Sequence, residues 1–419
     1  MIVYIVYFLF SVIMGFVLLL ASVFNHKIRT NYYNSYKQLF QLKKILRDVK
    51  NSNKQVLIFH AASVGEYEQI KPILRGVDGT KFFIVQTFTS PSIYNVETND
   101  EGLYDMKCYH PLDIFWLSYL FFRIIHPNKY IITRHDLWPG HILMANYFKI
   151  PIYYINANIH KNSIWYKKSF RFLSRFFLNK INRFVVPSKY ISENLHEILP
   201  TAVSVIMQDT RFNQTVYLKN RSKNYQFINQ ENPSRNQVIT FGSIDEMDEK
   251  IIYKILPTLC KIKKIILVPH EVGRKTIHRI EDNLDKLSIS YSKFSKTAID
   301  FSKNIILVDE LGLLAHLYAL GSHAYVGGGF KRGVHSVLEP AVHGCLIACG
   351  PNIEMLDEAK LLKEEGYLTI INNRLNLETF SHQSGDGPDF MHNLSSVATD
   401  MVELLLPSVS ENSGIPIES

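Results

Sequence analysis

The stretch Ala324–Asn352, AYVGGGFKRGVHSVLEPAVHGCLIACGPN, decides the kind of fold that this chain adopts. Its first residues form an apolar run typical of a buried strand, which leads directly into the glycines 327–329. Glycine permits positive φ and lets the backbone approach a ligand closely. The segment Ser336–Val342 predicts a helix, so the glycines and the helix start would frame an anion site. The structural alternative is a plain turn in which Ser336 and Glu339 form a capping box.

From Val56 onward the chain alternates strand-like runs with longer segments that can form helices. Such alternation is typical of parallel sheets covered by helices. Two series of runs, separated by a polar seam near residues 205–237, predict an α/β chain of two doubly wound domains that face a cleft. The runs are Val56–His60, Phe82–Thr87, Tyr130–Thr133, Ile152–Asn156 and Phe184–Pro187, then Val238–Gly242, Ile265–Pro269, Ile305–Asp309, Ala324–Gly327 and Leu346–Gly350.

Residues 1–23 form an almost uncharged apolar run, and about 20 such residues are enough to cross a bilayer. The run lacks a clear positive start and a small-residue cleavage site, so an uncleaved anchor is favoured over a signal peptide. From Lys27 to Lys54 there are eight Lys or Arg against one acid, Asp48. By the positive-inside rule we expect the rest of the chain to stay in the cytoplasm.

The basic segment carries seven of the eight net positive charges of the chain, eight minus one. Because the charge is not spread over a face with a known reading motif, we expect no nucleic-acid partner. A surface that meets anionic lipid heads fits better. The stretch Trp165–Lys180 interleaves aromatic and basic residues, and it could lie on a membrane or be an ordinary domain helix. The four cysteines are scattered, and we interpret them as reduced packing residues.

Ligands of open parallel sheets bind beyond the carboxyl ends of the strands, so the candidate residues are sought there. Glu66 follows the first run and falls in the first turn of a predicted helix, where a carboxylate could take a proton from an alcohol. Ser63 and Glu66 also have capping-box spacing, and the two interpretations are even. We expect His60 to be a satisfied strand-end histidine rather than a catalyst.

A second strand end carries Arg134, His135, Asp136 and Trp138. Arg134 could bind a carboxylate or phosphate in a bidentate manner, or pair with Asp136. The four acids within residues 245–249 suit a helix start better than a metal site, so no metal is expected.

Seven motifs in this order and spacing resemble those of transferases of 3-deoxy-D-manno-octulosonic acid (Kdo) in lipopolysaccharide synthesis, nearest to the form found in Bacteroidota-like bacteria. They are HAASVGEYEQ at 60–69, DTRF at 209–212, GS followed by DE within 242–249, PHE at 269–271, DELGLLAHLY at 309–318, GGGFKRGVHSVLEPAVHG at 327–344 and GPN at 350–352.

This resemblance implies an inverting, metal-independent glycosyltransferase of the GT-B fold, with two Rossmann-like domains. It would move Kdo from CMP-Kdo to a hydroxyl of a lipid A precursor on the cytoplasmic face of the inner membrane, with no cofactor beyond that donor. Glu66 resembles the family's catalytic base. The family's CMP site falls here on Pro269, His270, Leu311, Gly312, Leu313, Ser336, Val337, Leu338 and Glu339.

Three further roles are our own inference from the residues. We expect Glu339 to accept hydrogen bonds from ribose hydroxyls, and His335 and Arg211 to contact phosphate or the Kdo carboxylate. The expected domains are an anchor helix at 1–23, a basic juxtamembrane segment at 24–54, an acceptor domain at 55–205, an interdomain segment at 206–237, a CMP-sugar-binding domain at 238–406 and a disordered tail at 407–419.

Two alternatives stay open. Another nucleotide-sugar enzyme of the GT-B fold, such as a UDP-donor transferase or an epimerase, would share the glycine-rich loop but leave HAASVGE behind a membrane anchor unexplained. An inactive membrane-bound scaffold is suggested by departures from the family pattern at Gln208, Asn213, Lys331, Arg332 and the Arg134–Asp136 turn. Retention of both Glu66 and Glu339 argues against the scaffold.

Overall fold

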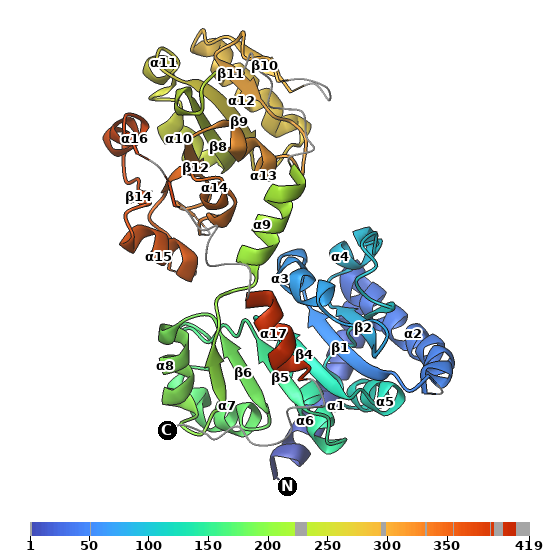
Figure 1. The fold of residues 1–419 in the computed structure, drawn as a ribbon. Coiled ribbons are helices and arrows are strands. Elements are labelled where there is room, and N and C mark those ends of the chain that lie inside the picture. Colours follow the sequence, from blue (N-terminus) through green and yellow to red (C-terminus); the bar gives the residue numbers. More distant parts are fainter. Residues whose placement is uncertain are drawn as a thin grey trace. The chain divides into compact units, whose positions relative to one another are not determined.

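A computed structural model describes residues 2–50, 52–222, 233–294, 299–331, 333–354, 356–385, 387–388 and 397–407. The chain divides into two compact units (Figure 1), one formed by Met1–Gln214 with Ser395–Ser419 and the other by Thr215–Leu394. Each unit is built on a parallel sheet of seven strands. The expected disordered tail lies, apart from Pro407, outside the described residues.

The first sheet has the order β3-β2-β1-β4-β5-β6-β7, with every pair parallel. Alternate residues of β1 enter two different cores: Ile58 packs with α2 and α5 on one face, and Phe59 packs with α3 and α17 on the other. The strand must therefore be apolar at almost every position, which is why its sequence reads as an unbroken run. The strands are β1 Gln55–Ala61, β2 Phe82–Phe88, β3 Met106–Tyr109, β4 Lys129–Thr133, β5 Ile152–Ile155, β6 Arg183–Val186 and β7 Ser204–Ile206.

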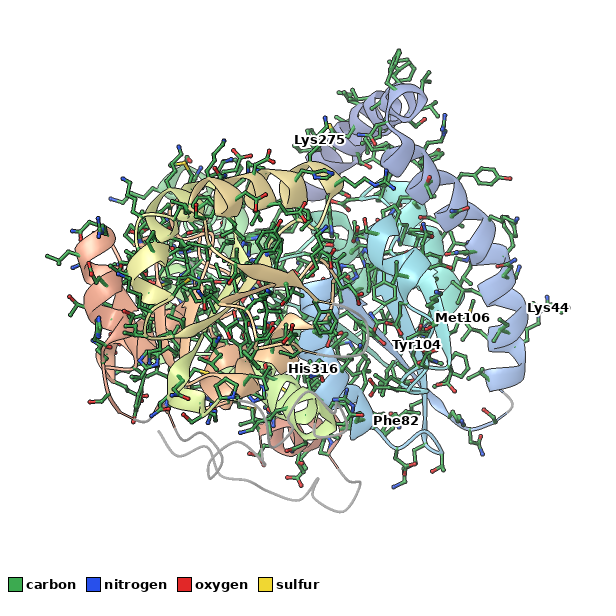
Figure 2. All side chains as sticks on the ribbon, turned by 90° about the horizontal axis from the view of Figure 1, so that it is seen from above. Lys44, Phe82, Tyr104, Met106, Lys275 and His316 are labelled. Atoms are coloured by element: carbon green, nitrogen blue, oxygen red, sulfur yellow. The ribbon has the colours of Figure 1, made fainter. Side chains whose placement is uncertain are left out.

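The helices of this unit are α1 Ile2–Phe24, α2 His26–Lys50, α3 Val64–Arg75, α4 Pro91–Val96, α5 Phe115–Ile125, α6 Pro139–Tyr147, α7 Arg171–Leu178, α8 Lys189–Ile198 and α17 Val397–Leu405. Helix α2 lies along the outside of the unit, and Lys44 projects from it into the surroundings (Figure 2). Within the basic aromatic stretch, α7 is a domain helix whose Phe177 is buried, while Phe172 is 73% exposed.

Helix α1 packs on the unit through one narrow stripe, Tyr7, Ser11 and Gly15, spaced four residues apart. Tyr7 Oη donates to Asp113 Oδ1 at 2.8 Å, and the amide of Phe115 donates to Ser11 Oγ at 2.6 Å. The remaining faces of α1 expose apolar side chains, including those of Ile13, Phe16 and Phe24. Within α1, the segment Ile5–Phe24 is long and apolar enough to cross a membrane by length and composition.

The position of α17 corrects one predicted boundary. We expected residues 238–406 to form a single domain, but α17 returns to the first unit and packs against α3. Met401 and Leu405 lie four residues apart on one face and are fully buried there. Because one face of α17 is apolar, the helix must bury that face in a hydrophobic core. The core in which it is buried is the one that also contains the apolar side chains of α3.

The second sheet has the order β10-β11-β9-β8-β12-β13-β14, again parallel throughout. Its strands are β8 Val238–Ile244, β9 Lys264–Pro269, β10 Tyr291–Lys293, β11 Ile305–Leu307, β12 His323–Val326, β13 Leu346–Cys349 and β14 Leu368–Ile370. Its helices are α10 Glu246–Ile252, α11 Leu256–Leu259, α12 Arg274–Lys286, α13 Leu314–Leu317, α14 Leu338–Val342, α15 Asp357–Glu364 and α16 Arg374–Ser381. Helix α9, Arg211–Ser222, leads from the first unit into the second, so part of the expected linker is helical.

Candidate active site

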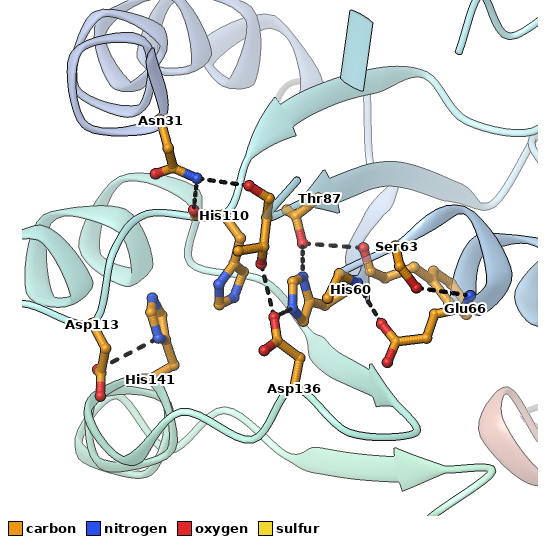
Figure 3. A network of polar contacts seen from close by, with 12 residues as sticks. Asn31, His60, Ser63, Glu66, Thr87, His110, Asp113, Asp136 and His141 are labelled. Atoms are coloured by element: carbon orange, nitrogen blue, oxygen red, sulfur yellow. Dashed lines mark hydrogen bonds and ion pairs between the residues drawn. The ribbon is translucent and has the colours of Figure 1, made fainter. Parts of the chain in front are cut away.

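Glu66 occupies the first turn of α3, directly beyond the carboxyl end of β1. Ser63 caps the helix, because its Oγ accepts the amide of Glu66 at 3.4 Å. The Glu66 carboxylate does not complete a capping box; its Oε2 accepts the amide of Ala62 at 2.6 Å (Figure 3). Only 5% of Glu66 is exposed, and burial raises the pKa of its carboxyl, an effect that the Ala62 hydrogen bond partly opposes. A carboxylate with a raised pKa is the better proton acceptor near neutral pH.

His60 ends β1 beside Glu66 and is fully buried. Its Nδ1 lies 2.9 Å from Thr87 Oγ1 and its Nε2 lies 2.8 Å from Asp136 Oδ2. Thr89 Oγ1 donates to the same Asp136 oxygen at 2.7 Å. The hydrogen bonds of His60 agree with the expectation of a satisfied strand-end histidine. They also give Asp136 a partner that the sequence did not suggest, since we considered only Arg134.

Asp136 remains charged in this environment. Burial alone would raise its pKa, but the interaction with His60 and the hydrogen bonds from Trp138 and Thr89 together outweigh burial and lower the pKa to about 2. Arg134, at a left-handed φ of 60°, donates from Nε to His135 Nε2 at 3.0 Å. The turn therefore presents a fixed carboxylate near Glu66, and that carboxylate adds to the rise in the pKa of Glu66.

Three histidines from distant parts of the chain stack into a column behind this turn (Figure 3). The ring centroids of His60 and His110 are 3.8 Å apart, and those of His110 and His141 are 4.0 Å apart. Burial lowers the pKa of His110 well below its usual value and that of His141 to about 3, so both are neutral. At the far end, His141 Nδ1 lies 3.6 Å from Asp113 Oδ1, the atom that Tyr7 of α1 also contacts. The column thus runs from the neighbourhood of Glu66 to the apolar helix.

The DTRF motif is tied to the helix that carries Glu66. Gln69, one turn further along α3, donates from Nε2 to both carboxylate oxygens of Asp209 at 3.1 and 2.9 Å. Asn156 Nδ2 donates to Thr210 Oγ1 at 3.0 Å. Arg211 Nη2 lies 2.9 Å from Asp209 Oδ2, and its side chain is 21% exposed. The guanidinium proposed as a phosphate or carboxylate contact is therefore held in place by its own turn.

In the second unit, the segments expected to bind CMP follow β9, β11 and β12. These strands belong to one parallel sheet, so Pro269 and His270, residues 311–313, and residues 336–339 all lie at its carboxyl edge. His270 and His335 stack with centroids 4.3 Å apart and rings inclined by 14°. Burial and the neighbouring His270 lower the pKa of His335. Gly312 has a φ of 87°, a conformation that favours glycine.

The glycine run serves close packing more directly than the sequence indicated. A Cβ on Gly329 would lie 2.7 Å from the backbone of Gly350. The amide of Gly328 donates to Asp248 Oδ2 at 2.9 Å, and Tyr325 Oη donates to Asp248 Oδ1 at 2.7 Å. Asp248 is fully buried in the first turn of α10, where sequence alone indicated a helix start and nothing more. One amide of the expected anion site is therefore already bonded within the protein.

The expected helix at Ser336–Val342 starts later than predicted. It is α14, Leu338–Val342, with Val337 as its N-cap and no side-chain cap. The amide of Val334 donates to Asn352 O and that of His335 donates to Gly327 O, both at 3.1 Å, so the chain before Ser336 is fixed by hydrogen bonds to two other loops. The capping-box alternative at Ser336 is therefore wrong, and a helix of five residues provides little dipole for an anion.

Glu339 lies in the first turn of α14, and burial raises the pKa of its carboxyl to about 7, while a hydrogen bond with Ser336 opposes the rise. Glu339 also acts on the buried Tyr318. Burial is the main cause of the raised pKa of that phenol, and the charge of Glu339 is the next largest cause. Among the residues that the structure describes, no group of three or more His, Cys, Asp or Glu side chains is arranged to hold a metal ion. Arg332 lies outside the described residues.

Residues 35–214 match the family model described as 3-deoxy-D-manno-octulosonic-acid transferase (kdotransferase). The curated 3-deoxy-D-manno-octulosonic acid transferase of Aquifex aeolicus is 26% identical over 336 residues, 78% of this chain and 85% of that protein. The enzyme of that name from Rickettsia prowazekii is 24% identical over 407 residues, 93% of this chain and 81% of that protein. The one from Chlamydophila psittaci is 24% identical over 311 residues, 71% of this chain and 69% of that protein.

Among solved structures, the chain is similar to the UDP-GlcNAc 2-epimerase from Methanocaldococcus jannaschii, with a TM-score of 0.59 and 13% identity over 84% of this chain and 99% of that one. The UDP-N-acetylglucosamine 2-epimerase from Rickettsia bellii gives a TM-score of 0.56 and 13% identity over 85% of this chain and 97% of that one. At such low identity these likenesses show the fold alone.

Two doubly wound units, with candidate residues at the carboxyl edge of each sheet, form the architecture of the GT-B fold. The match over residues 35–214 covers Glu66, the Asp136 turn and the DTRF motif. Together with the curated relatives, which are similar to the chain over 71–93% of its length, this match supports a Kdo transferase and hence a glycosyltransferase. The residues expected to bind CMP lie outside the matched range, so their roles rest on motif resemblance and on their placement at one sheet edge.

Proposed function

We propose that this protein transfers Kdo from CMP-Kdo to a hydroxyl of a lipid A precursor with inversion at the anomeric carbon. The observation that carries the proposal is the placement of Glu66. It is a buried carboxylate with a raised pKa, held by the Ala62 amide at the carboxyl edge of a sheet, within the part of the chain that matches the family.

In the proposed reaction, Glu66 accepts the proton of the acceptor hydroxyl. The acceptor oxygen forms a bond to the anomeric carbon of Kdo while the bond between that carbon and the phosphate oxygen breaks. CMP leaves with the bonding electron pair, and one base suffices for this single displacement. Burial raises the pKa of Glu66 most, and the charge of Asp136 adds to that rise, while the Ala62 amide and His60 oppose it.

We propose that the second unit holds the donor through Pro269, His270, residues 311–313 and residues 336–339. Glu339 has a pKa of about 7, so it is partly ionised at neutral pH and can accept hydrogen bonds from the ribose hydroxyls. His335 and Arg211 remain our candidates for contact with the phosphate or the Kdo carboxylate. The displacement itself requires no metal ion, since CMP leaves with a single phosphate group whose charge side-chain cations and hydrogen-bond donors can balance.

We also propose that α1 anchors the protein to the inner membrane and that both units stay on its cytoplasmic face. The exposed apolar faces of α1 and the basic residues that follow it support this arrangement. The basic and aromatic residues of α7 give the membrane arrangement less support. Arg171 Nη2 pairs with Glu197 at 3.2 Å and Arg175 Nε donates to Ile198 O at 2.7 Å, so its cations already serve the packing of α7 on α8.

Nucleotide competition tests the donor class. The full-length protein in detergent should bind CMP, and UDP should not compete. Glu339→Gln should weaken CMP binding, whereas Glu365→Gln, at an exposed position just beyond α15, should leave it unchanged. Competition by UDP with no effect of CMP would replace the proposal with a UDP-sugar enzyme of the same fold.

A further inference from the structure

A pocket of about 460 Å³ lies between α2 and α5, on the outer face of the first unit. Its apolar walls come from Leu39, Phe40, Leu46, Leu120 and Ile124. Three cations, Lys43, Arg47 and Arg123, line the same pocket. Apolar walls with a cationic side match a ligand that has an anionic head and a hydrocarbon tail.

The pocket is separate from the candidate active site. Arg123 and Ile124 lie at the end of α5, just before β4 begins, whereas Glu66 follows the end of β1. Strands β1 and β4 are parallel neighbours, so the pocket and Glu66 lie toward opposite edges of one sheet. Strand β1 has seven residues, so at roughly 3.3 Å per residue these two edges are about 20 Å apart. A hydroxyl that reacts at Glu66 is therefore not the group held here.

The setting of the pocket indicates the kind of ligand, because two of its cations, Lys43 and Arg47, belong to α2, the basic helix that follows the apolar α1. Helix α1 packs against both α2 and α5, and its outer faces are apolar and exposed. Phe40, which lines the pocket, is 62% exposed, so an aliphatic chain can continue from the pocket along its ring. Arg123 Nη1 donates to Tyr119 Oη at 3.2 Å, which orients the guanidinium on α5.

We propose that the α2–α5 pocket binds an anionic glycerophospholipid of the membrane. Lys43, Arg47 and Arg123 hold its phosphate, and Leu39, Phe40 and Ile124 contact the upper part of one acyl chain. The volume fits a head group and the start of a chain, and the rest of the lipid lies outside the pocket. Bound in this way, the lipid holds α2 and α5 of the first unit at the membrane surface.

The test is native mass spectrometry of the full-length protein in a non-ionic detergent, titrated with phosphatidylglycerol or phosphatidylcholine in the absence of donor. The pocket variant is Lys43→Ala/Arg47→Ala. The matched control is Lys37→Ala/Lys44→Ala, which removes the same charge from exposed positions of the same helix that do not line the pocket. Equal circular dichroism spectra establish that both variants are folded.

We expect the wild-type protein to bind phosphatidylglycerol at least tenfold more tightly than phosphatidylcholine. The pocket variant should lose that preference, and the control should stay within about twofold of the wild type, because each lost phosphate contact acts locally. Equal losses in both variants, or no preference in the wild type, would overturn the proposal. A pocket variant that still binds phosphatidylglycerol but no longer binds a bisphosphorylated lipid A precursor would also overturn the proposal, because the pocket would then bind the acceptor. Binding is read without turnover, so the outcome is independent of Kdo transfer.

Discussion

Asp136 Oδ2 lies 2.8 Å from Nε2 of the buried His60, and this pair stands beside Glu66 at the carboxyl edge of the first sheet. The pair fixes a negative charge near the proposed base, because His60 helps to lower the pKa of Asp136 to about 2. That charge in turn contributes to the raised pKa of Glu66. In the proposed reaction Asp136 would be a positioning residue, which acts through the Glu66 carboxylate.

Replacing Asp136 by Asn tests this role. We expect kcat to fall by roughly ten- to a hundredfold, since small displacements of a base are costly. The acid limb of the pH profile of kcat should also move to lower pH, because loss of the neighbouring charge lowers the pKa of Glu66. Asp100→Asn, at an exposed site, is the control. An unshifted pH profile would reduce Asp136 to a structural role.

The contact between Tyr7 and Asp113 predicts how firmly α1 is attached. Tyr7→Phe leaves the Asp113 carboxylate without that O–H donor, and we expect the free energy of unfolding of the first unit to fall by about 1–3 kcal/mol. Gly140→Ala should act similarly, because its Cβ would lie 1.8 Å from Tyr7 Oη. Tryptophan fluorescence reports this unit alone, since all three tryptophans belong to it. Tyr33→Phe, at an exposed position of α2, should have no effect, and a loss equal to that of Tyr7→Phe would disprove the contact.

The histidine column predicts a loss of stability in acid. Folded His141 titrates near pH 3, whereas a free histidine titrates near about pH 6.5. Between these values His141 is protonated in the unfolded chain but not in the folded chain. The free energy of unfolding therefore falls as the pH drops from about 6.5 toward 3. Asp113, with its pKa raised to about 6, contributes with the opposite sign between about 3.9 and 6.

Comparison with His141→Phe isolates the histidine, because Asp113 is present in both proteins. Denaturation at pH 7.5 and 5.0, followed by tryptophan fluorescence, should show a smaller loss of stability in the variant than in the wild type. Phe also suits the site, which His110, Phe121 and Phe122 surround with aromatic rings. Equal losses of stability in the two proteins would contradict a His141 that stays neutral in the folded protein.

Glu339 predicts a pH dependence of nucleotide binding. Its carboxyl has a pKa of about 7. The ionised carboxylate accepts hydrogen bonds with both oxygens, whereas the protonated form also donates one. The affinity for cytidine should therefore rise between pH 6 and pH 8. Cytidine avoids the titration of the CMP phosphate near about pH 6. In Glu339→Gln the affinity should be lower and flat over this range. A wild-type affinity that does not change with pH would remove Glu339 from the ribose site.

The ten strands predicted from the sequence are the ten inner strands of the two sheets, and the four that were missed are their four edges. Inner parallel strands are buried on both faces and read as continuous apolar runs, as in Val56–His60. The edge strands, such as Ser204–Ile206 and Tyr291–Lys293, have only three or four residues and are partly exposed. Their sequences therefore carry no apolar signal distinguishable from a loop.

The same contrast holds for the candidate site. Glu66 was predicted because one local pattern, a strand followed by a helix start, placed it at a sheet edge. The column of His60, His110 and His141 depends on packing between segments far apart in sequence, and no local pattern contains it. The predicted start of α14 was wrong because the spacing of Ser336 and Glu339 indicates a cap that the structure does not form, and the N-cap falls on Val337 instead.

The most direct test of the proposed function is transfer of Kdo from CMP-Kdo, generated in place, to a tetraacylated lipid A precursor in the presence of a chelator. The wild-type protein should remain active, and Glu66→Gln should bind CMP normally while its transfer rate falls by about 10²–10⁴, the range for loss of a general base. Glu68→Gln, on the same helix, should retain transfer because Glu68 contacts Lys71 and Gln214 and makes no hydrogen bond to the Ala62 turn that holds Glu66. Normal turnover by Glu66→Gln would show that another group is the base. No transfer by a folded wild-type protein would contradict the proposed donor and acceptor.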